Sequence, residues 1–254
     1  VAQWIRTQNS LALSETLHTL IDTYRQDFSS YARTKQVKYV NLVFDAIPLQ
    51  LGNKFKYSTI GDNTRKRELG PALELLITAG IALKISATSA QGIPLYAGSK
   101  QNGFKVLFLD IGLAQNALGL DHADWLINPL EHICNKGAVI ESFVGQELAT
   151  YTRPFSQSTL FYWRKESSMH SAEIDYLTVR NSQVIPVEVK AGKGTGLKSM
   201  RSFLEMHPES PYGVRFSTNP FSIYEQLHSY PLYAVSTLCA HDTVVREALL
   251  SLCE

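Results

Sequence analysis

The spacing of apolar residues predicts helices in the first third of the chain. Over residues 13–29, leucine, isoleucine and aromatic side chains recur every third or fourth position, which is typical of an amphipathic helix. The same spacing predicts a second helix over about 38–50 that ends near Pro48. The turn signals Gly52-Asn53 and Gly61-Asp62-Asn63 follow, so a loop separates this helix from the next apolar segment.

A third helix is expected within residues 69–83, where leucines line one helical face. Gly70 can cap this helix, Pro71 can occupy its first position, and Gly80 marks its end. A longer helix that starts at Thr64 and is kinked at Pro71 is the alternative.

A small hairpin is predicted next, because the segments IALKISA and PLYAG alternate on either side of Gln91-Gly92. Helix, loop, helix and hairpin is the order of a winged helix. A plain pair of helices packed on a hairpin is the alternative.

The rest of the chain alternates strands with two helices. A strand with a turn is expected at 104–113, and a helix follows at 137–151. The remaining predicted elements are strands 159–164, 172–180 and 183–190, a helix at 196–207, and a strand at 212–217. This order, α-β-β-β-α-β, predicts an α/β (α+β) domain with a mixed sheet. With 254 residues, the chain is expected to hold two domains, a helical, winged-helix-like region (1–103) and the α/β domain (104–254).

Charge is divided unevenly between these regions. The formal net charge is +1, but residues 1–100 hold 12 basic and 7 acidic side chains, whereas the remainder holds 12 and 16. Within 33–67 the cations face only Asp45 and Asp62. Cations at a helix N-terminus oppose its dipole, so a phosphate backbone is one explanation for them, and a solvated loop is the other. The candidate nucleic-acid-binding residues are Lys54, Lys56, Arg65, Lys66 and Arg67.

Other compositional features exclude several classes. No apolar run is long enough to span a membrane, and the N-terminus lacks an apolar signal core. The 3 cysteines form no C-x-x-C pair, and the histidines form no H-E-x-x-H motif, which argues against a zinc site and fits a cytoplasmic setting. No G-x-S-x-G nucleophile elbow is present.

The hairpin of strands 172–180 and 183–190 carries the candidate chemistry. Only Asn181-Ser182 separates the strands, which predicts a two-residue turn with Arg180 opposite Gln183. This register places Asp175 opposite Glu188 and Glu173 opposite Lys190. Strand alternation then puts these four charged residues on one face, with Ile174, Tyr176, Ile185, Val187 and Val189 on the core face.

Facing carboxylates repel each other unless a cation lies between them. Oxygen ligands select Mg²⁺ or Mn²⁺, so Asp175 and Glu188 are candidate metal ligands. Such an ion polarises a phosphate and activates water, and Lys190 can position that water or stabilise the developing charge. A surface hairpin with a weak Glu173–Lys190 salt bridge is the alternative reading.

Asp175 followed by Glu188-Val189-Lys190 resembles the signature of the PD-(D/E)XK nuclease superfamily. The segments GAVIESFVGQEL, FYWR, AEIDYL, VIPVEVKAG and FKVLFLDIGL are similar to the C-terminal domain of unknown function in bacterial and archaeal ATPases. In that family the domain follows a P-loop ATPase domain and a winged-helix segment. The resemblance implies a nuclease-like site of Glu141, Asp175, Glu188 and Lys190, with Glu147 as the second candidate for the helical acid.

The chain has no G-x-x-x-x-G-K-[ST] sequence, so we expect no ATPase activity and no cofactor site apart from Mg²⁺ or Mn²⁺. The resemblance implies an upstream ATPase domain of the same protein as a partner, which has either been removed or is absent, and the missing initiator Met favours removal. The sequence thus predicts a DNA-binding module that cleaves phosphodiesters if its site is active. A non-catalytic DNA- or protein-binding regulatory module is the alternative.

Overall fold

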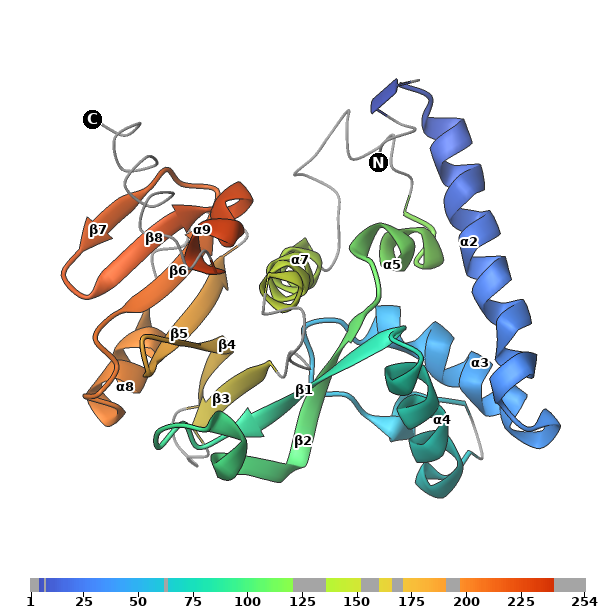
Figure 1. The fold of residues 1–254 in the computed structure, drawn as a ribbon, viewed down its shortest axis with the longest axis horizontal. Coiled ribbons are helices and arrows are strands. Elements are labelled where there is room, and N and C mark those ends of the chain that lie inside the picture. The colour runs from blue at the N-terminus through green and yellow to red at the C-terminus, as the bar shows by residue number, and fades with distance from the viewer. Residues whose placement is uncertain are drawn as a thin grey trace. The chain divides into compact units, whose positions relative to one another are not determined.

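The computed structural model describes residues 5–6, 8–61, 64–120, 136–151, 160–165, 171–190 and 197–239. The fold is α+β with a mixed sheet, as predicted (Figure 1). The chain divides into two compact units: residues 1–83 with 105–139, and residues 84–104 with 140–254. The predicted single boundary after residue 103 stays a prediction.

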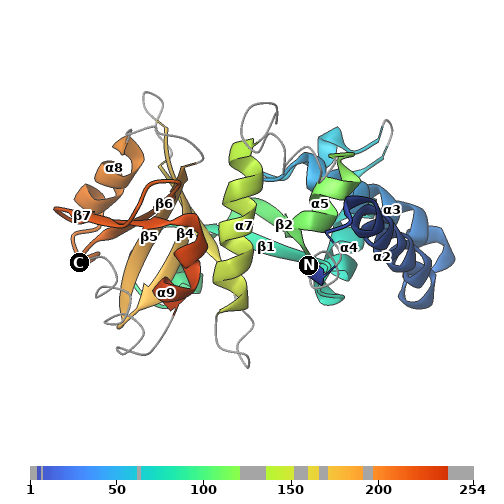
Figure 2. The same cartoon turned by 90° about the horizontal axis from the view of Figure 1, so that it is seen from above.

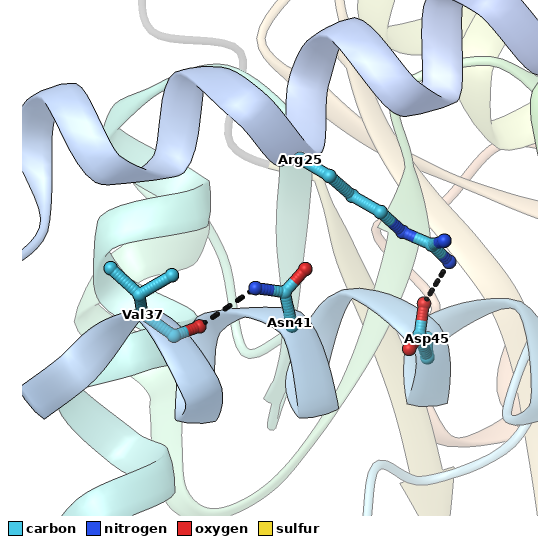
Figure 3. Close-up of polar contacts among 4 residues, drawn as sticks. All are labelled: Arg25, Val37, Asn41 and Asp45. Atoms are coloured by element: carbon cyan, nitrogen blue, oxygen red, sulfur yellow. Dashed lines mark hydrogen bonds and ion pairs between the residues drawn. The ribbon is translucent and has the colours of Figure 1, made fainter. Parts of the chain in front are cut away.

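The first unit contains helices α2 (Ser10–Tyr31), α3 (Thr34–Leu49), α4 (Lys66–Thr78) and α5 (Ile111–Ala117). The apolar faces predicted for the first three helices contribute to its core, whose fully buried members include Phe28, Val40, Val43, Phe44, Ile47, Leu69, Leu73 and Leu76. Arg25 of α2 and Asp45 of α3 form an exposed ion pair of 2.7 Å (Figure 3). Asp45 therefore has a partner on α2, outside the basic stretch 33–67.

α4 begins earlier than expected and contains Pro71 in its interior. The start at Gly70-Pro71 was therefore wrong, and the longer helix is closer to the structure. The N-terminus is stabilised further upstream, because the Glu68 carboxylate accepts a hydrogen bond from the Arg65 amide at 3.3 Å. The predicted end is confirmed: Gly80 has a φ of +73°, and the Ile81 amide donates to the Leu76 carbonyl at 2.9 Å.

The predicted hairpin has a different second strand. β1 (Ala82–Thr88) is present, but PLYAG forms a short 3-10 helix, η2 (Leu95–Gly98), and the strand that follows is β2 (Ser99–Phe108). The Ala97 amide donates to the Pro94 carbonyl at 3.0 Å, which turns the chain at the point where a strand was expected. Asp110 then caps α5 by accepting from the Leu113 amide at 2.9 Å. The segment 104–113 therefore ends in the first residues of a helix, where a turn was expected.

The second unit contains the predicted order of elements, here α7 (Lys136–Thr150), β3 (Phe161–Lys165), β4 (Ala172–Arg180), β5 (Gln183–Lys190), α8 (Lys198–Met206) and β6 (Gly213–Ser217). Further along lie β7 (Ser222–Tyr224), β8 (Leu227–Pro231), η3 (Leu232–Ala234) and α9 (Val235–Cys239). α7 starts in the first unit and continues into the second. No helix in the described part of the chain is long and apolar enough to cross a membrane.

The strands form one sheet in the order β2-β1-β3-β4-β5-β6-β8-β7. β3, β4 and β5 pair antiparallel, whereas β5, β6 and β8 pair parallel. Figures 1 and 2 show α8 against one side of β4–β6 and α9 on the other side. α8 packs Met200 and Phe203 onto Trp163, Ile174 and Val184, and this cluster is the core on the α8 side.

Candidate active site

The β4–β5 hairpin has the predicted register. Asn181 and Ser182 both have positive φ, which is the type I′ geometry of two-residue turns, and Arg180 pairs with Gln183. The paired positions continue to Tyr176 opposite Val187. One residue beyond that pair, Asp175 Oδ2 accepts a hydrogen bond from the Val189 amide at 2.8 Å. The carboxylate of Asp175 is thereby fixed to the backbone of the residue between Glu188 and Lys190.

β4 is bulged at this point, which changes the predicted faces. Phe161 of β3 pairs with Leu177, and Trp163 pairs with Ile174, so Asp175 and Tyr176 together lie opposite a single residue of β3. Ile174 consequently packs in the same cluster as Val184, not with Ile185 and Val187 as regular alternation predicted. The single charged face was therefore wrong for β4, since Asp175 reaches β5 from the bulge.

Glu188 and Lys190 form the second part of the site. Lys190 Nζ lies 2.6 Å from Glu188 Oε1, and the Glu188 side chain is 4% exposed whereas that of Lys190 is 35% exposed. Glu173, the predicted partner of Lys190, lies opposite Arg164 of β3, and the paired positions of β4 and β5 end at Tyr176, so its position opposite Lys190 stays a prediction. Among the described residues, Glu188 Oε2 has no hydrogen-bond partner. Glu188 thus presents one satisfied and one unsatisfied carboxylate oxygen.

The pKa of the Glu188 carboxyl depends on its burial and on the charges around it. Burial raises the pKa of the carboxyl above its ordinary value, and the hydrogen bond and charge of Lys190 oppose that shift. The negative charge of Asp175 raises the pKa further, and the positive charge of Arg215 lowers it. Asp175, Lys190 and Arg215 therefore all act on the Glu188 charge, as members of one site do.

The helical acid of the predicted site is on α7. The Tyr176 hydroxyl, on the bulge, donates to the Glu141 carbonyl at 2.9 Å. Burial and the charges of Glu141 and Asp175 raise the pKa of Tyr176 well above its usual range. This turn of α7 is thus packed on β4 beside Asp175, and Glu141 is better placed than Glu147 by these contacts. The Glu173 amide donates to Ser199 Oγ of α8 at 3.4 Å, and no role follows for its carboxylate.

The donor set fits a hard divalent cation. Asp175 and Glu188 supply carboxylate oxygens, and Glu188 Oε2 is a buried acceptor with no partner in the described part of the chain. A cation there would satisfy this oxygen and offset the repulsion of Asp175. Within the same residues, however, no group of three or more His, Cys, Asp or Glu side chains is placed so that it could hold a metal ion.

All five candidate nucleic-acid-binding residues are exposed in the first unit: Lys54, Lys56, Arg65, Lys66 and Arg67. Arg65 precedes α4, and Lys66 and Arg67 form its first turn. The Glu68 carboxylate in this turn has a lowered pKa, chiefly because it accepts from the Arg65 backbone, and also through Tyr39 and the charges of Arg67 and Lys38. Glu68 therefore offsets part of the unfavourable charge at this helix end from within the chain.

Arg215 of β6 was not among the candidates. It is the register partner of Glu188 and lies between the fully buried Val214 and Phe216. A cation in the middle of an otherwise apolar strand is the sequence signal that marks it. Without the parallel register of β5 and β6, that signal could not be connected to Glu188.

Comparison with family models finds two matches, one in each half of the chain. Residues 136–235 match a domain of unknown function, DUF4143. This DUF4143 match includes Glu141, Asp175, Glu188, Lys190 and Arg215. Residues 2–124 match a second domain of unknown function, DUF8612, which includes the exposed basic residues. Neither description names an activity, and no curated protein matches the chain.

Among solved structures, the crystal structure of protein VC1899 from Vibrio cholerae is similar at 18% sequence identity and a TM-score of 0.28. The match covers 92% of this chain and 56% of that chain. This chain thus spans about half the length of that protein.

Proposed function

We propose that this chain is a nucleic-acid-binding module with a Mg²⁺- or Mn²⁺-dependent phosphodiester-cleaving site of the PD-(D/E)XK type. The observation that supports the proposal is the hydrogen bond from the Val189 amide to Asp175. It connects Asp175 to the centre of the Glu188-Val189-Lys190 sequence, so the residues of the signature converge although 13 positions separate Asp175 from Glu188 in the sequence.

Each residue has a distinct chemical role in this proposal. Asp175 and Glu188 would hold the cation, which supplies Lewis-acid activation of the phosphate and a lower pKa for bound water. Lys190, one third exposed, has an ammonium group that can orient the water or stabilise the charge that develops on the phosphate. Glu141 adds a carboxylate from α7 on the Asp175 side of the site.

Binding is assigned to the exposed cations of the first unit. These side chains are exposed, so they can contact phosphates without any unfolding of the chain: Lys54, Lys56, Arg65, Lys66 and Arg67. Such contacts make affinity fall with salt, with a slope of about 0.9 per phosphate on duplex DNA. DNA is the proposed ligand, and the family resemblance adds an upstream P-loop ATPase domain as the proposed partner.

A cleavage assay tests the catalytic claim. End-labelled single-stranded, duplex and branched DNA and RNA are incubated with the full chain and Mg²⁺ or Mn²⁺. We expect cleavage that EDTA stops and that Lys190→Ala and Asp175→Asn abolish. Arg201→Gln, an exposed change on α8, is the matched control and should retain cleavage. Equal products from wild type and Lys190→Ala would show that a contaminant cuts, and would refute the proposal.

A non-catalytic regulatory module is the second candidate, and the Lys190–Glu188 ion pair favours it. This pair already neutralises one carboxylate without a metal ion. Under this reading the chain retains DNA in a salt-dependent way, binds no Mn²⁺ at Asp175, and cuts nothing. Replacing Arg65, Lys66 and Arg67 together with glutamine should weaken retention under either reading, since both assign phosphate contacts to this run.

A further inference from the structure

Arg215 shares a strand pair and a face with Glu188. β5 and β6 are parallel, and the register places Glu188 opposite Arg215 and Lys190 opposite Ser217. Register partners in neighbouring strands point to the same side of a sheet, at a strand separation of about 4.8 Å. The side chains of Arg215 and Glu188 therefore lie next to each other on the same face of the sheet.

These two neighbours have opposite charges, yet their buried atoms do not pair. Glu188 Oε2 and Arg215 Nε are both buried, and neither has a hydrogen-bond partner among the described residues. A buried polar atom left unsatisfied costs about 1–3 kcal/mol. Two such atoms, an acceptor and a donor on adjacent strands, mark a place where a ligand supplies the missing partners.

The two atoms need different partners. The Glu188 oxygen requires a donor or a cation, whereas the Arg215 N–H requires an acceptor. A metal-bound phosphate satisfies both, because the cation meets the carboxylate and a phosphate oxygen accepts from the guanidinium. The planar guanidinium also suits the geometry of phosphate oxygens better than an ammonium group does.

We infer that Arg215 binds the phosphate of the nucleic-acid substrate, beside the Glu188-Val189-Lys190 sequence. The inference rests on the proposed function, because it uses the same carboxylate site. It adds a phosphate-binding residue from β6 to a site that the sequence placed on α7, β4 and β5 alone. Arg215 would hold the phosphate while Lys190 acts on the water or the developing charge.

Binding of an uncut oligonucleotide tests the inference separately from cleavage. Affinity for a labelled single-stranded DNA is measured over a range of salt concentrations with Ca²⁺ in place of Mg²⁺, and gels confirm that the probe is intact. Arg215→Gln should reduce the salt slope by about 0.7, which is the loss of one phosphate contact. Arg201→Gln removes the same charge from an exposed position on α8 and should leave the slope unchanged.

Arg215→Lys is the second variant, because it keeps the charge if Arg215→Gln fails to fold. It should keep the salt slope but weaken binding about tenfold, as expected for the loss of one charge-assisted hydrogen bond. If both Arg215 variants fold and bind DNA with unchanged affinity and salt slope, and only their unfolding temperature is lowered, the inference is overturned. Arg215 would then have a structural role, as a counter-ion or through a bridging water. If wild type binds but never cuts, the catalytic proposal fails while a reduced Arg215→Gln slope still supports this one.

Discussion

Removing the Lys190 charge tests the electrostatics of the site most sharply. In the wild type, Lys190 Nζ contacts Glu188 Oε1 at 2.6 Å, and the Glu188 side chain is 4% exposed. Lys190→Met keeps the aliphatic stem and removes the partner of Oε1. Surface ion pairs contribute about 0–1 kcal/mol, whereas orphaning one member of a buried pair costs about 3–5 kcal/mol. Since Lys190 is 35% exposed, we expect a loss of about 1–3 kcal/mol at pH 7.

Urea unfolding of four proteins measures this loss: wild type, Lys190→Met, Glu188→Gln and the double variant. The loss should be close to zero in the Glu188→Gln background, because no buried charge is left to orphan. It should also shrink at low pH. The pKa of Glu188 is raised by burial, so the carboxyl becomes protonated at a higher pH than an ordinary glutamate and then needs no counter-ion. An equal loss in both backgrounds, or a loss independent of pH, would refute the coupling.

Three further predictions follow from the contacts of the second unit. Because the pKa of Glu188 is raised in the fold, wild-type stability should fall as pH rises from the ordinary glutamate pKa to the raised one, and pH-dependent unfolding of Glu188→Gln should lack this slope. Asp175→Ala should cost about 1 kcal/mol in urea unfolding, since the Val189 amide loses its acceptor, whereas Asp175→Asn should retain most of that stability but lose cleavage. Gly213→Ala places a Cβ against the buried Met200 side chain and should cost about 1–3 kcal/mol in thermal unfolding, with Met200→Ala reducing that increment; equal increments in both backgrounds would contradict the clash.

Local sequence signals were sufficient for much of the second unit. The apolar helix over 137–151 and the strands on either side of Asn181-Ser182 each carry their own pattern, and the two-residue turn determines the hairpin register without distant contacts. The convergence of Asp175 with Glu188 and Lys190 followed from that register. This is why the candidate residues could be named from the sequence.

Features that depend on neighbouring strands could not be predicted in the same way. The bulge at Asp175 and Tyr176 is defined by the pairing of β4 with β3, whose register shifts between Phe161 and Trp163. The role of Arg215 depends on β6 pairing with β5, and the intervening helix hides that pairing in the sequence. α4 starts before Pro71, where the Glu68 side chain accepts from the Arg65 amide and the Glu68 and Leu69 amides donate to the Arg65 carbonyl, whereas Pro71 favoured a start at the first turn.

Mn²⁺ titration of the full chain, followed by electron paramagnetic resonance, tests the central claim that Asp175 and Glu188 hold a divalent cation. We predict saturable binding to wild type that is lost in Asp175→Asn and in Glu188→Gln. Lys190→Met should retain binding, because the lysine competes for Glu188 Oε1 and supplies no ligand. Arg201→Gln should bind as wild type does. Absence of saturable Mn²⁺ binding by wild type, or binding that survives both carboxylate substitutions, would contradict the claim.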